Sequence, residues 1–324
     1  MLKVHVLQAL TPENLAEFHR QVSAEVQLTA GLDLPVPAEY EILVASQPKR
    51  IHVEASPRLR AVIIPHTGVA EDVQKLMAEF PEVAVHNAHH PGVPTAEMAV
   101  ALLMAAARRL VPADRAFRDA DWNGSGRPEQ AVLLEGKTVL ILGYGEIGQR
   151  VARVCQALGM RVVVTRRSLA TPLMGEVEIH PAAHLAQLLP RAQVLMITLP
   201  LTPSTRGLIG AAELALLPPG AILVNVGRGP VVDEAALYAA LHDGPLSAAG
   251  LDVWYNYPPD EAARSHTRPS AYPFHELDNV VLSPHRGGLT AESERRGLVQ
   301  IAHMLNAAAR GEPMPNRVDV EVGY

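Results

Sequence analysis

The stretch Leu142-Gly143-Tyr144-Gly145-Glu146-Ile147-Gly148 decides the fold. An apolar, β-branched run at residues 139–142 predicts a strand before it, and an amphipathic segment at about residues 149–158 predicts a helix after it. In the spacing G-x-G-x-x-G, the first glycine lets the chain turn sharply, the second leaves no Cβ between backbone and pyrophosphate, and the third lets the helix pack against the strand. The helix N-terminus directs its amides at the phosphates. Strand, glycine turn and helix together predict a dinucleotide-binding domain.

Strand-like runs alternate with helical patterns on both sides of this turn. Before it, strands are predicted at residues 4–7, 41–45, 59–64 and 83–86, with helices after Thr11 and at about residues 70–80. After it, six strands are predicted at residues 139–142, 161–165, 194–198, 222–226, 248–251 and 280–282. Strands joined by helical crossovers form parallel sheets. The sequence therefore predicts an α/β protein with two doubly wound parallel-sheet domains, a Rossmann-type domain and a smaller flavodoxin-like one.

Two further helices are predicted, one before the glycine turn in the sequence and one near the end of the chain. A helix at about residues 95–110 is apolar nearly all round, so we expect it to be buried between layers or domains. A last helix is predicted at residues 293–310. Residues 121–128 carry glycine, serine and proline and are interpreted as a surface connection.

Composition limits the classes of protein and partner. A chain of 324 residues suggests about two domains. The formal net charge of −6, with no long Lys/Arg run, argues against a nucleic-acid partner. The longest apolar stretch, residues 98–107, is shorter than the roughly 20 residues that span a bilayer, and no signal-peptide pattern opens the chain. We therefore expect a soluble, cytoplasmic protein without a membrane partner.

The single cysteine, Cys155, excludes an internal disulfide and fits a reducing compartment. It lies on the apolar side of the helix predicted after the glycine turn. We interpret it as a packed core residue rather than a nucleophile. No metal ligand set is predicted.

Two loops follow predicted strands and place reactive side chains at one edge of the sheet. Arg228 stands between glycines in residues 225–233, and a guanidinium can hold a carboxylate through two hydrogen bonds. His285 follows the last strand, between Pro284 and a pair of glycines, and histidine exchanges protons near neutral pH. Ligands of such sheets bind outside the carboxyl ends of the strands, so we expect both side chains at the ligand. A surface arginine in a turn is the alternative for Arg228.

Together these segments resemble the D-isomer-specific 2-hydroxyacid dehydrogenases. The resemblance runs in family order from about Thr95 to Gly288, through residues 136–148, 158–160, 199–205, 225–233, 250–253 and 283–285. It implies hydride transfer from NAD(P)H to a small-molecule 2-keto acid, giving a D-2-hydroxy acid. It also implies a discontinuous substrate (catalytic) domain of residues 1–94 and 289–324, a dinucleotide-binding domain of residues 95–288, and a homodimer formed through the cofactor domain.

The resemblance also assigns roles to residues. Arg228 would bind the substrate carboxylate and carbonyl, and His285 would give its proton to the carbonyl oxygen. Thr67, Gly68 and Val69 would present backbone amides to the carboxylate, and a turn with glycine can point free N–H groups at an anion. The residues predicted to bind the cofactor, with Asp252 on the nicotinamide side, are Thr95, Gly143, Gly145, Glu146, Ile147, Gly148, Thr165, Arg166, Arg167, Pro200, Thr205, Val226, Gly227, Asp252 and Gly287.

One departure from the family concerns the partner of His285. The family usually has a glutamate five residues after the aspartate that Asp252 matches, and here that position is Tyr257. A carboxylate beside His285 would favour imidazolium and raise its pKa. A tyrosine hydroxyl can hydrogen-bond the ring but adds no charge, and Asp260 or Glu261 could substitute if the loop folds back. We include Tyr257 among the catalytic residues and hypothesise that the pKa of His285 is lower than is usual in the family.

A second departure concerns the cofactor. An acidic residue about 20 positions after the glycine turn normally binds the ribose 2′-hydroxyl. Counting from the turn reaches Thr165-Arg166-Arg167-Ser168, which holds no acid. A carboxylate repels a 2′-phosphate, whereas arginines pair with it. The sequence therefore predicts an NAD(P) site that favours NADP(H) over NAD(H); two solvent-facing arginines without influence are the alternative.

Alternatives of function remain at this stage. One keeps the enzyme class and changes the substrate to a formate-like one-carbon anion. The other is a cofactor-binding regulatory protein with little turnover, which Tyr257 keeps open and which Arg228 and His285 argue against. The proline-punctuated insertion at residues 258–273 covers the cleft or contacts a partner subunit, since long ordered loops are usually functional.

Replacing Tyr257 by glutamate is expected to extend keto-acid reduction to higher pH, because a neighbouring carboxylate keeps imidazolium protonated. The pH dependence of kcat/KM, measured for the wild type and Tyr257→Glu, checks this. An unchanged profile in the variant contradicts the hypothesis.

Overall fold

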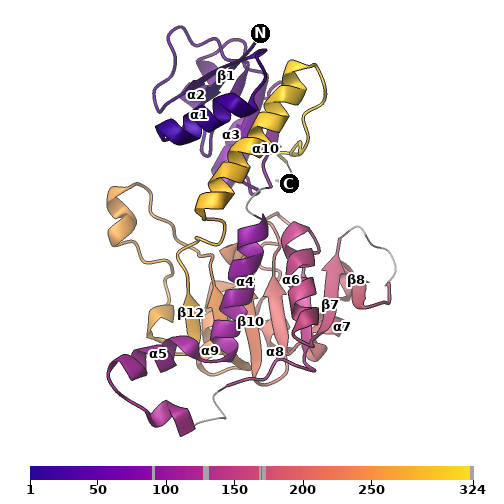
Figure 1. Cartoon of the computed structure of the whole chain (residues 1–324). Helices are drawn as coiled ribbons and strands as arrows, with labels where there is room; N and C mark the ends of the chain where they lie inside the picture. Colours follow the sequence, from indigo (N-terminus) through magenta and orange to yellow (C-terminus); the bar gives the residue numbers. More distant parts are fainter. Residues whose placement is uncertain (90–91, 127–130, 168, 170–172, 322–324) are drawn as a thin grey trace. The chain divides into compact units, whose positions relative to one another are not determined.

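The protein divides into two compact units, each described by itself (Figure 1). The computed structural model describes residues 1–89, 92–126, 131–167, 169 and 173–321. The discontinuous unit comprises Met1–Gly92 and Leu289–Tyr324, and the continuous unit comprises Val93–Gly288.

The discontinuous unit is built on a five-stranded parallel sheet of order β2-β1-β3-β4-β5. This is the flavodoxin-like order, and it confirms the predicted doubly wound plan. The helix predicted after Thr11 begins at Pro12, where the Thr11 hydroxyl accepts a hydrogen bond from the Asn14 amide at 3.2 Å. The elements are β1 (Leu2–Val6), α1 (Pro12–Gln21), β2 (Val26–Ala30), β3 (Ile42–Val44), α2 (Arg50–Glu54), β4 (Ala61–Ile64), α3 (Glu71–Ala78), β5 (Ala84–Asn87) and α10 (Ala291–Ala309).

Helices cover both faces of this sheet because successive strand residues point to opposite sides. Val4, Ile42 and Ile63 pack with Phe18 of α1 and with the buried face of α10. On the other face, the neighbouring strand residues pack with side chains of α2 and α3. The last helix, far away in the sequence, therefore completes the core of the N-terminal unit.

The continuous unit is built on a seven-stranded parallel sheet of order β12-β11-β10-β9-β6-β7-β8. Counted from β6, the strand that opens the glycine turn, this is the Rossmann order extended by one strand. The elements are α4 (Gly92–Ala107), α5 (Leu110–Arg118), β6 (Thr138–Leu142), α6 (Glu146–Ala157), β7 (Arg161–Arg166), β8 (Val177–Pro181), α7 (Leu185–Leu188), β9 (Val194–Ile197), α8 (Ala211–Ala215), β10 (Ala221–Asn225), α9 (Glu234–His242), β11 (Leu246–Leu251) and β12 (Val280–Leu282), with single turns of 3₁₀-helix between some of them.

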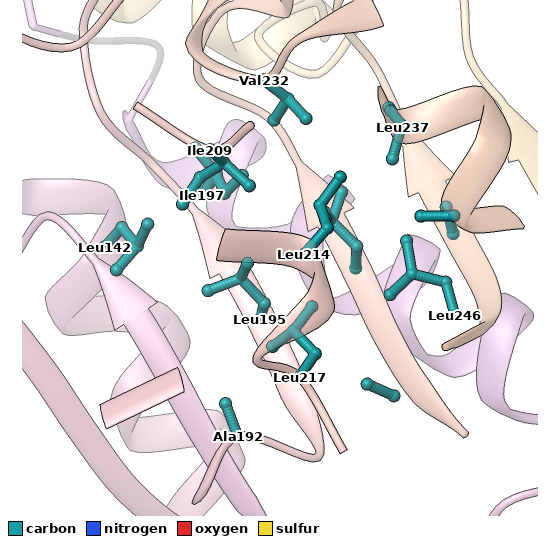
Figure 2. Close-up of a cluster of buried hydrophobic side chains, with 14 of the residues drawn as sticks. Leu142, Ala192, Leu195, Ile197, Ile209, Leu214, Leu217, Val232, Leu237 and Leu246 are labelled. Atoms are coloured by element: carbon teal, nitrogen blue, oxygen red, sulfur yellow. The ribbon is translucent and has the colours of Figure 1, made fainter. Parts of the chain in front are cut away.

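The sheet of this unit is also buried on both faces. Figure 2 shows one core, a single cluster that includes Leu195 and Ile197 of β9, Leu214 of α8 and Leu237 of α9. On the opposite face, alternate strand residues meet α4 and α6. Helix α4 lies so close to β11 that a Cβ at Gly250 would come within 2.7 Å of the Leu102 Cβ. The predicted burial of this apolar helix follows from that contact.

The ten predicted strands are all present, each within about two residues of its predicted ends, and the structure adds β2 and β8. Both added strands lie at the edge of a sheet and carry polar side chains along one side, such as Glu178 and His180 in β8. Edge strands lack the continuous apolar run of a buried strand. The expected six strands of the cofactor domain were therefore one too few, and the short helices α2 and α5 were also not predicted.

Two expectations about single features can be compared with the structure directly. Cys155 is buried in the core between α6 and the sheet, and burial raises the pKa of its thiol to about 12, which confirms a packed residue. Within the described residues, none of the helices has both the length and the apolar composition needed to span a bilayer.

Candidate active site

The glycine turn between β6 and α6 is held by close backbone contacts. Gly143 has φ +96°, and a Cβ at Gly148 would lie 2.1 Å from the Gly143 carbonyl oxygen. The Thr198 hydroxyl, at the end of the neighbouring β9, lies 3.0 Å from the carbonyl oxygens of Leu142 and Gly143. The protein itself therefore requires glycine at the first and third positions of the motif.

The second glycine of the motif is different. Gly145 is exposed, its φ is −82°, and a Cβ there would meet no atom of the described protein within 4 Å. The first helical bond runs from the Gln149 amide to the Gly145 carbonyl at 3.0 Å, and the described residues offer no acceptor to the amides of Glu146 and Ile147. Open space beside free amides is what a dinucleotide pyrophosphate needs, so the turn fits such a cofactor.

The end of β7 carries Thr165, Arg166 and Arg167, the residues predicted to lie near the cofactor ribose. Thr165 is buried, whereas Arg166 and Arg167 are exposed. Within the described part of the chain, neither arginine pairs with a carboxylate. Ser168 lies outside the described residues. Two uncompensated positive charges thus lie at the edge of the strand that follows the glycine turn.

The loop after β10 presents Arg228. The Asn225 side chain braces it, accepting from the Gly227 amide and donating to the Arg228 carbonyl, both at 3.0 Å. A Cβ at Gly227 would lie 2.4 Å from the Leu199 carbonyl oxygen, and a Cβ at Gly229 would lie 2.2 Å from the Trp254 carbonyl oxygen. The loop therefore packs tightly against the loops after β9 and β11. Burial lowers the pKa of the Arg228 guanidinium and Tyr257 opposes this shift, which places the two side chains within electrostatic reach.

Asp252 at the end of β11 organises the histidine loop. Its side chain is 1% exposed and accepts hydrogen bonds from the Ser283 hydroxyl at 2.5 Å, the Arg286 amide at 2.9 Å and the Gly287 amide at 2.8 Å. His285, between these donors, has a left-handed φ of +54° and is exposed. The predicted cofactor ligand Asp252 thus holds the backbone that carries His285.

Tyr257 contacts His285 through its ring. The ring centroids are 5.4 Å apart at an interplanar angle of 58°, and the Trp254 amide donates to the Tyr257 hydroxyl oxygen at 3.1 Å. The structure thus brings Arg228, Tyr257 and His285 together at the carboxyl ends of β10, β11 and β12. Asp260 accepts from the Ala263 amide at 2.9 Å and Glu261 pairs with Arg264 at 3.0 Å, so these acids make contacts within their own turn.

The insertion at residues 258–273 is anchored at its far end. The amides of Tyr255 and Asn256 donate to the Pro269 carbonyl, and the Ser270 hydroxyl donates to the Glu234 carboxylate of α9 at 2.6 Å. These bonds hold the segment from Trp254 to Tyr257 in place. A positioning contact of this kind is a role that the sequence did not suggest.

The remaining predicted cofactor residues lie along the same edge. Thr205 shapes the loop after β9 by donating to the Pro200 carbonyl at 2.7 Å. Val226 is buried in the core, Gly287 is packed so tightly that a Cβ would lie 2.6 Å from the Asp252 carboxylate, and Thr95 lies in the first turn of α4.

The predicted carboxylate loop lies in the discontinuous unit, between β4 and α3. Within the described residues, the amides of Thr67, Gly68 and Val69 have no hydrogen-bond acceptor. The buried Asn87 donates to the Thr67 carbonyl at 2.6 Å and its Oδ1 lies 3.0 Å from His89 Nε2. Three open amides fit an anion, and Asn87 is a supporting residue that the sequence did not reveal.

Comparison with known proteins places the chain in a family. Residues 100–287, more than half of the chain, match the family described as D-isomer specific 2-hydroxyacid dehydrogenase, NAD binding domain. A glyoxylate reductase of Aeropyrum pernix is 35% identical over 338 residues, covering 99% of this chain and 96% of that protein. A D-3-phosphoglycerate dehydrogenase of Mycobacterium bovis is also 35% identical, but this chain spans only 59% of it.

Solved structures resemble the whole chain. An NADPH-dependent glyoxylate/hydroxypyruvate reductase from Sinorhizobium meliloti, in complex with NADP and sulfate, superposes with a TM-score of 0.80 at 25% identity over 100% of both chains. A D-isomer specific 2-hydroxyacid dehydrogenase from Xanthobacter autotrophicus Py2, in complex with NADPH and MES, gives 0.78 at 26% identity over 99% of both chains.

Replacement by alanine is expected to have different effects at the third glycine of the motif, Gly148, and at the second, Gly145. Gly148→Ala should destabilise the protein by about 1–3 kcal/mol because its Cβ meets the Gly143 carbonyl. Gly145→Ala should leave stability within about 0.5 kcal/mol yet weaken NADPH binding at least about tenfold, because the Cβ occupies the open space beside the amides. Urea denaturation and NADPH titration measure the two effects. Gly124→Ala, also open but outside the turn, is the control; wild-type affinity in Gly145→Ala would contradict the assignment.

Proposed function

The chain belongs to the D-isomer-specific 2-hydroxyacid dehydrogenases, and we propose that within this family it reduces a small 2-keto acid of the glyoxylate or hydroxypyruvate class to the D-2-hydroxy acid. As a member it is an NAD(P)-dependent oxidoreductase acting on the CH–OH group. The observation that carries the proposal is the grouping of Arg228, Tyr257 and His285 at the edge that also bears the glycine turn.

The cofactor is assigned to the continuous unit. Amides at Gly145, Glu146 and Ile147 would bind its pyrophosphate, and the loops at Thr205, Gly227 and Gly287 would flank the rest. When bound, the nicotinamide cofactor supplies the hydride.

The chain's own residues supply the other parts of the reaction. The Arg228 guanidinium would pair with the substrate carboxylate and polarise the adjoining carbonyl. Protonated His285 would deliver its proton to the carbonyl oxygen, as a general acid must when that oxygen gains negative charge. The open amides of Thr67, Gly68 and Val69 would bind an anion, which fits a substrate-binding role for the discontinuous unit.

NADP(H) is the cofactor that the electrostatics favour. Arg166 and Arg167 carry positive charge without a carboxylate partner in the described residues, and a 2′-phosphate would supply the missing anion. Two of the structural relatives, those from Sinorhizobium meliloti and Xanthobacter autotrophicus, contain NADP or NADPH.

A homodimer is proposed through the continuous unit. Helix α5 and the turn after it expose large apolar side chains, including Phe117 at 53% and Trp122 at 68%, whose rings meet edge-on at 4.7 Å. An exposed aromatic pair with neighbouring Leu110 and Val111 is the kind of patch that a protein interface covers. A second copy of this chain is the partner that the family resemblance implies.

A steady-state assay with glyoxylate, hydroxypyruvate and pyruvate, each with NADPH and NADH, tests the reaction. We expect turnover of at least one acid to the D-product, with higher kcat/KM for NADPH. Cofactor binding without turnover on any acid would favour a regulatory protein, and oxidation of formate alone would favour a one-carbon dehydrogenase.

Removing the two arginines should reverse the cofactor preference. In Arg166→Ala/Arg167→Ala, kcat/KM for NADPH is expected to fall about 10- to 100-fold, the equivalent of about 1.5–3 kcal/mol for hydrogen bonds to a charged group, while the value for NADH changes little. Arg161→Ala, at the exposed start of the same strand, is the matched control. Equal losses with both cofactors would refute the 2′-phosphate assignment.

Trp122→Asp should disrupt the dimer, because it places a charge in the proposed apolar interface. Sedimentation velocity is expected to give twice the chain mass for the wild type and a shift toward the single chain for the variant. A wild-type protein that sediments as one chain, or a variant that stays dimeric, contradicts this interface.

A further inference from the structure

The Tyr257 side chain is held in one direction by its surroundings. It lies after β11, at the end of the segment Trp254–Tyr257, which the hydrogen bonds of Tyr255 and Asn256 to the Pro269 carbonyl hold in place. One lone pair of its hydroxyl oxygen is occupied, because the oxygen accepts a hydrogen bond from the Trp254 amide at 3.1 Å. Its ring packs on the His285 ring at 5.4 Å. Both contacts use the oxygen lone pair and the ring, and neither uses the hydroxyl hydrogen.

That hydrogen is available as a donor. A phenol is both donor and acceptor. Across the described residues, the Tyr257 hydroxyl has a donor, Trp254, and no acceptor. Burial raises the pKa of the phenol more than the Trp254 hydrogen bond and Arg228 lower it, so the group keeps its proton at neutral pH. With the side chain 46% exposed, the hydrogen is accessible from outside the protein.

The neighbours of this donor indicate which atom it meets. Tyr257 contacts His285 and lies within electrostatic reach of Arg228. In the proposed reaction the substrate atom shared by these two groups is the carbonyl oxygen, which Arg228 polarises and His285 protonates. A donor fixed beside both of them is directed at that oxygen.

We propose that Tyr257 is a catalytic residue in its own right, whose hydroxyl donates a hydrogen bond to the substrate carbonyl oxygen and to the alkoxide that develops there. This inference rests on the proposed function and deepens it. The carbonyl carbon gains the hydride supplied by the reduced nicotinamide, the oxygen gains the His285 proton, and Tyr257 keeps its own proton throughout. A glutamate at this place would instead act on the charge of His285, so the two residue types contribute by different physical means.

Tyr257→Phe tests the inference because it keeps the ring and removes the donor. We expect kcat to fall about 10- to 100-fold with KM changed by less than about twofold, since a donor aimed at developing charge acts in the transition state. NADPH affinity should stay close to wild type, and the melting temperature should fall by only a few degrees, because the Trp254 amide loses its acceptor. Tyr272→Phe, which removes another hydroxyl from the same region, is the control and should leave kcat unchanged.

A second variant separates donation from packing. Tyr257→Gln supplies an N–H donor without the ring, so its kcat should exceed that of Tyr257→Phe. A Gln variant no faster than the Phe variant, an unchanged kcat in Tyr257→Phe, or a loss confined to KM would each overturn the donor role.

The wild type is assayed first, so that two failures stay distinct. No turnover of any 2-keto acid by the wild type contradicts the proposed function. Turnover by the wild type together with an equal kcat in Tyr257→Phe contradicts only the role of Tyr257.

Discussion

The buried carboxylate of Asp252 is the interaction on which the candidate site depends. A carboxyl group that is 1% exposed needs hydrogen-bond donors, and it obtains them from Ser283, Arg286 and Gly287. These donors flank His285 and hold it at φ +54°, a conformation that a residue with a Cβ adopts only at a cost. Trp254, two residues after Asp252, adds an indole bond to the Ser283 carbonyl at 2.8 Å. His285, the proposed general acid, is thus oriented by the strand next to its own.

Close backbone approach is the second constraint, and it unites the loops at this edge. Gly148 touches the Gly143 carbonyl, Gly227 the Leu199 carbonyl and Gly229 the Trp254 carbonyl, at distances that leave no room for a Cβ. The first contact closes the glycine turn, and the other two pack the loop after β10 against the loops after β9 and β11. Among the described residues, Gly145 has no such contact, so its lack of a side chain points to a ligand rather than to packing.

Charge distinguishes this site from the pattern of the family it belongs to. A neutral phenol stands where a carboxylate is usual, and two arginines stand where an acid normally meets the ribose. Both changes remove negative charge from the surroundings of the cofactor and the histidine. In the proposed mechanism, the first change would replace control of the histidine charge by a hydrogen-bond donor, and the second would favour a cofactor with an additional phosphate.

Local sequence patterns were enough to predict the buried strands, the glycine turn and the edge that carries Arg228 and His285, because apolar periodicity and turn chemistry act over a few residues. The edge strands β2 and β8 depend on the folded sheet, because their polar residues adopt strand conformation by pairing with a neighbouring strand. Three contacts of the site also depend on the folded chain. Asp252 accepts a hydrogen bond from Ser283, 31 residues further on, the Tyr257 hydroxyl accepts one from the Trp254 amide, and Asn87 donates one to the Thr67 carbonyl. These contacts join residues through the folded backbone, so no local pattern encodes them.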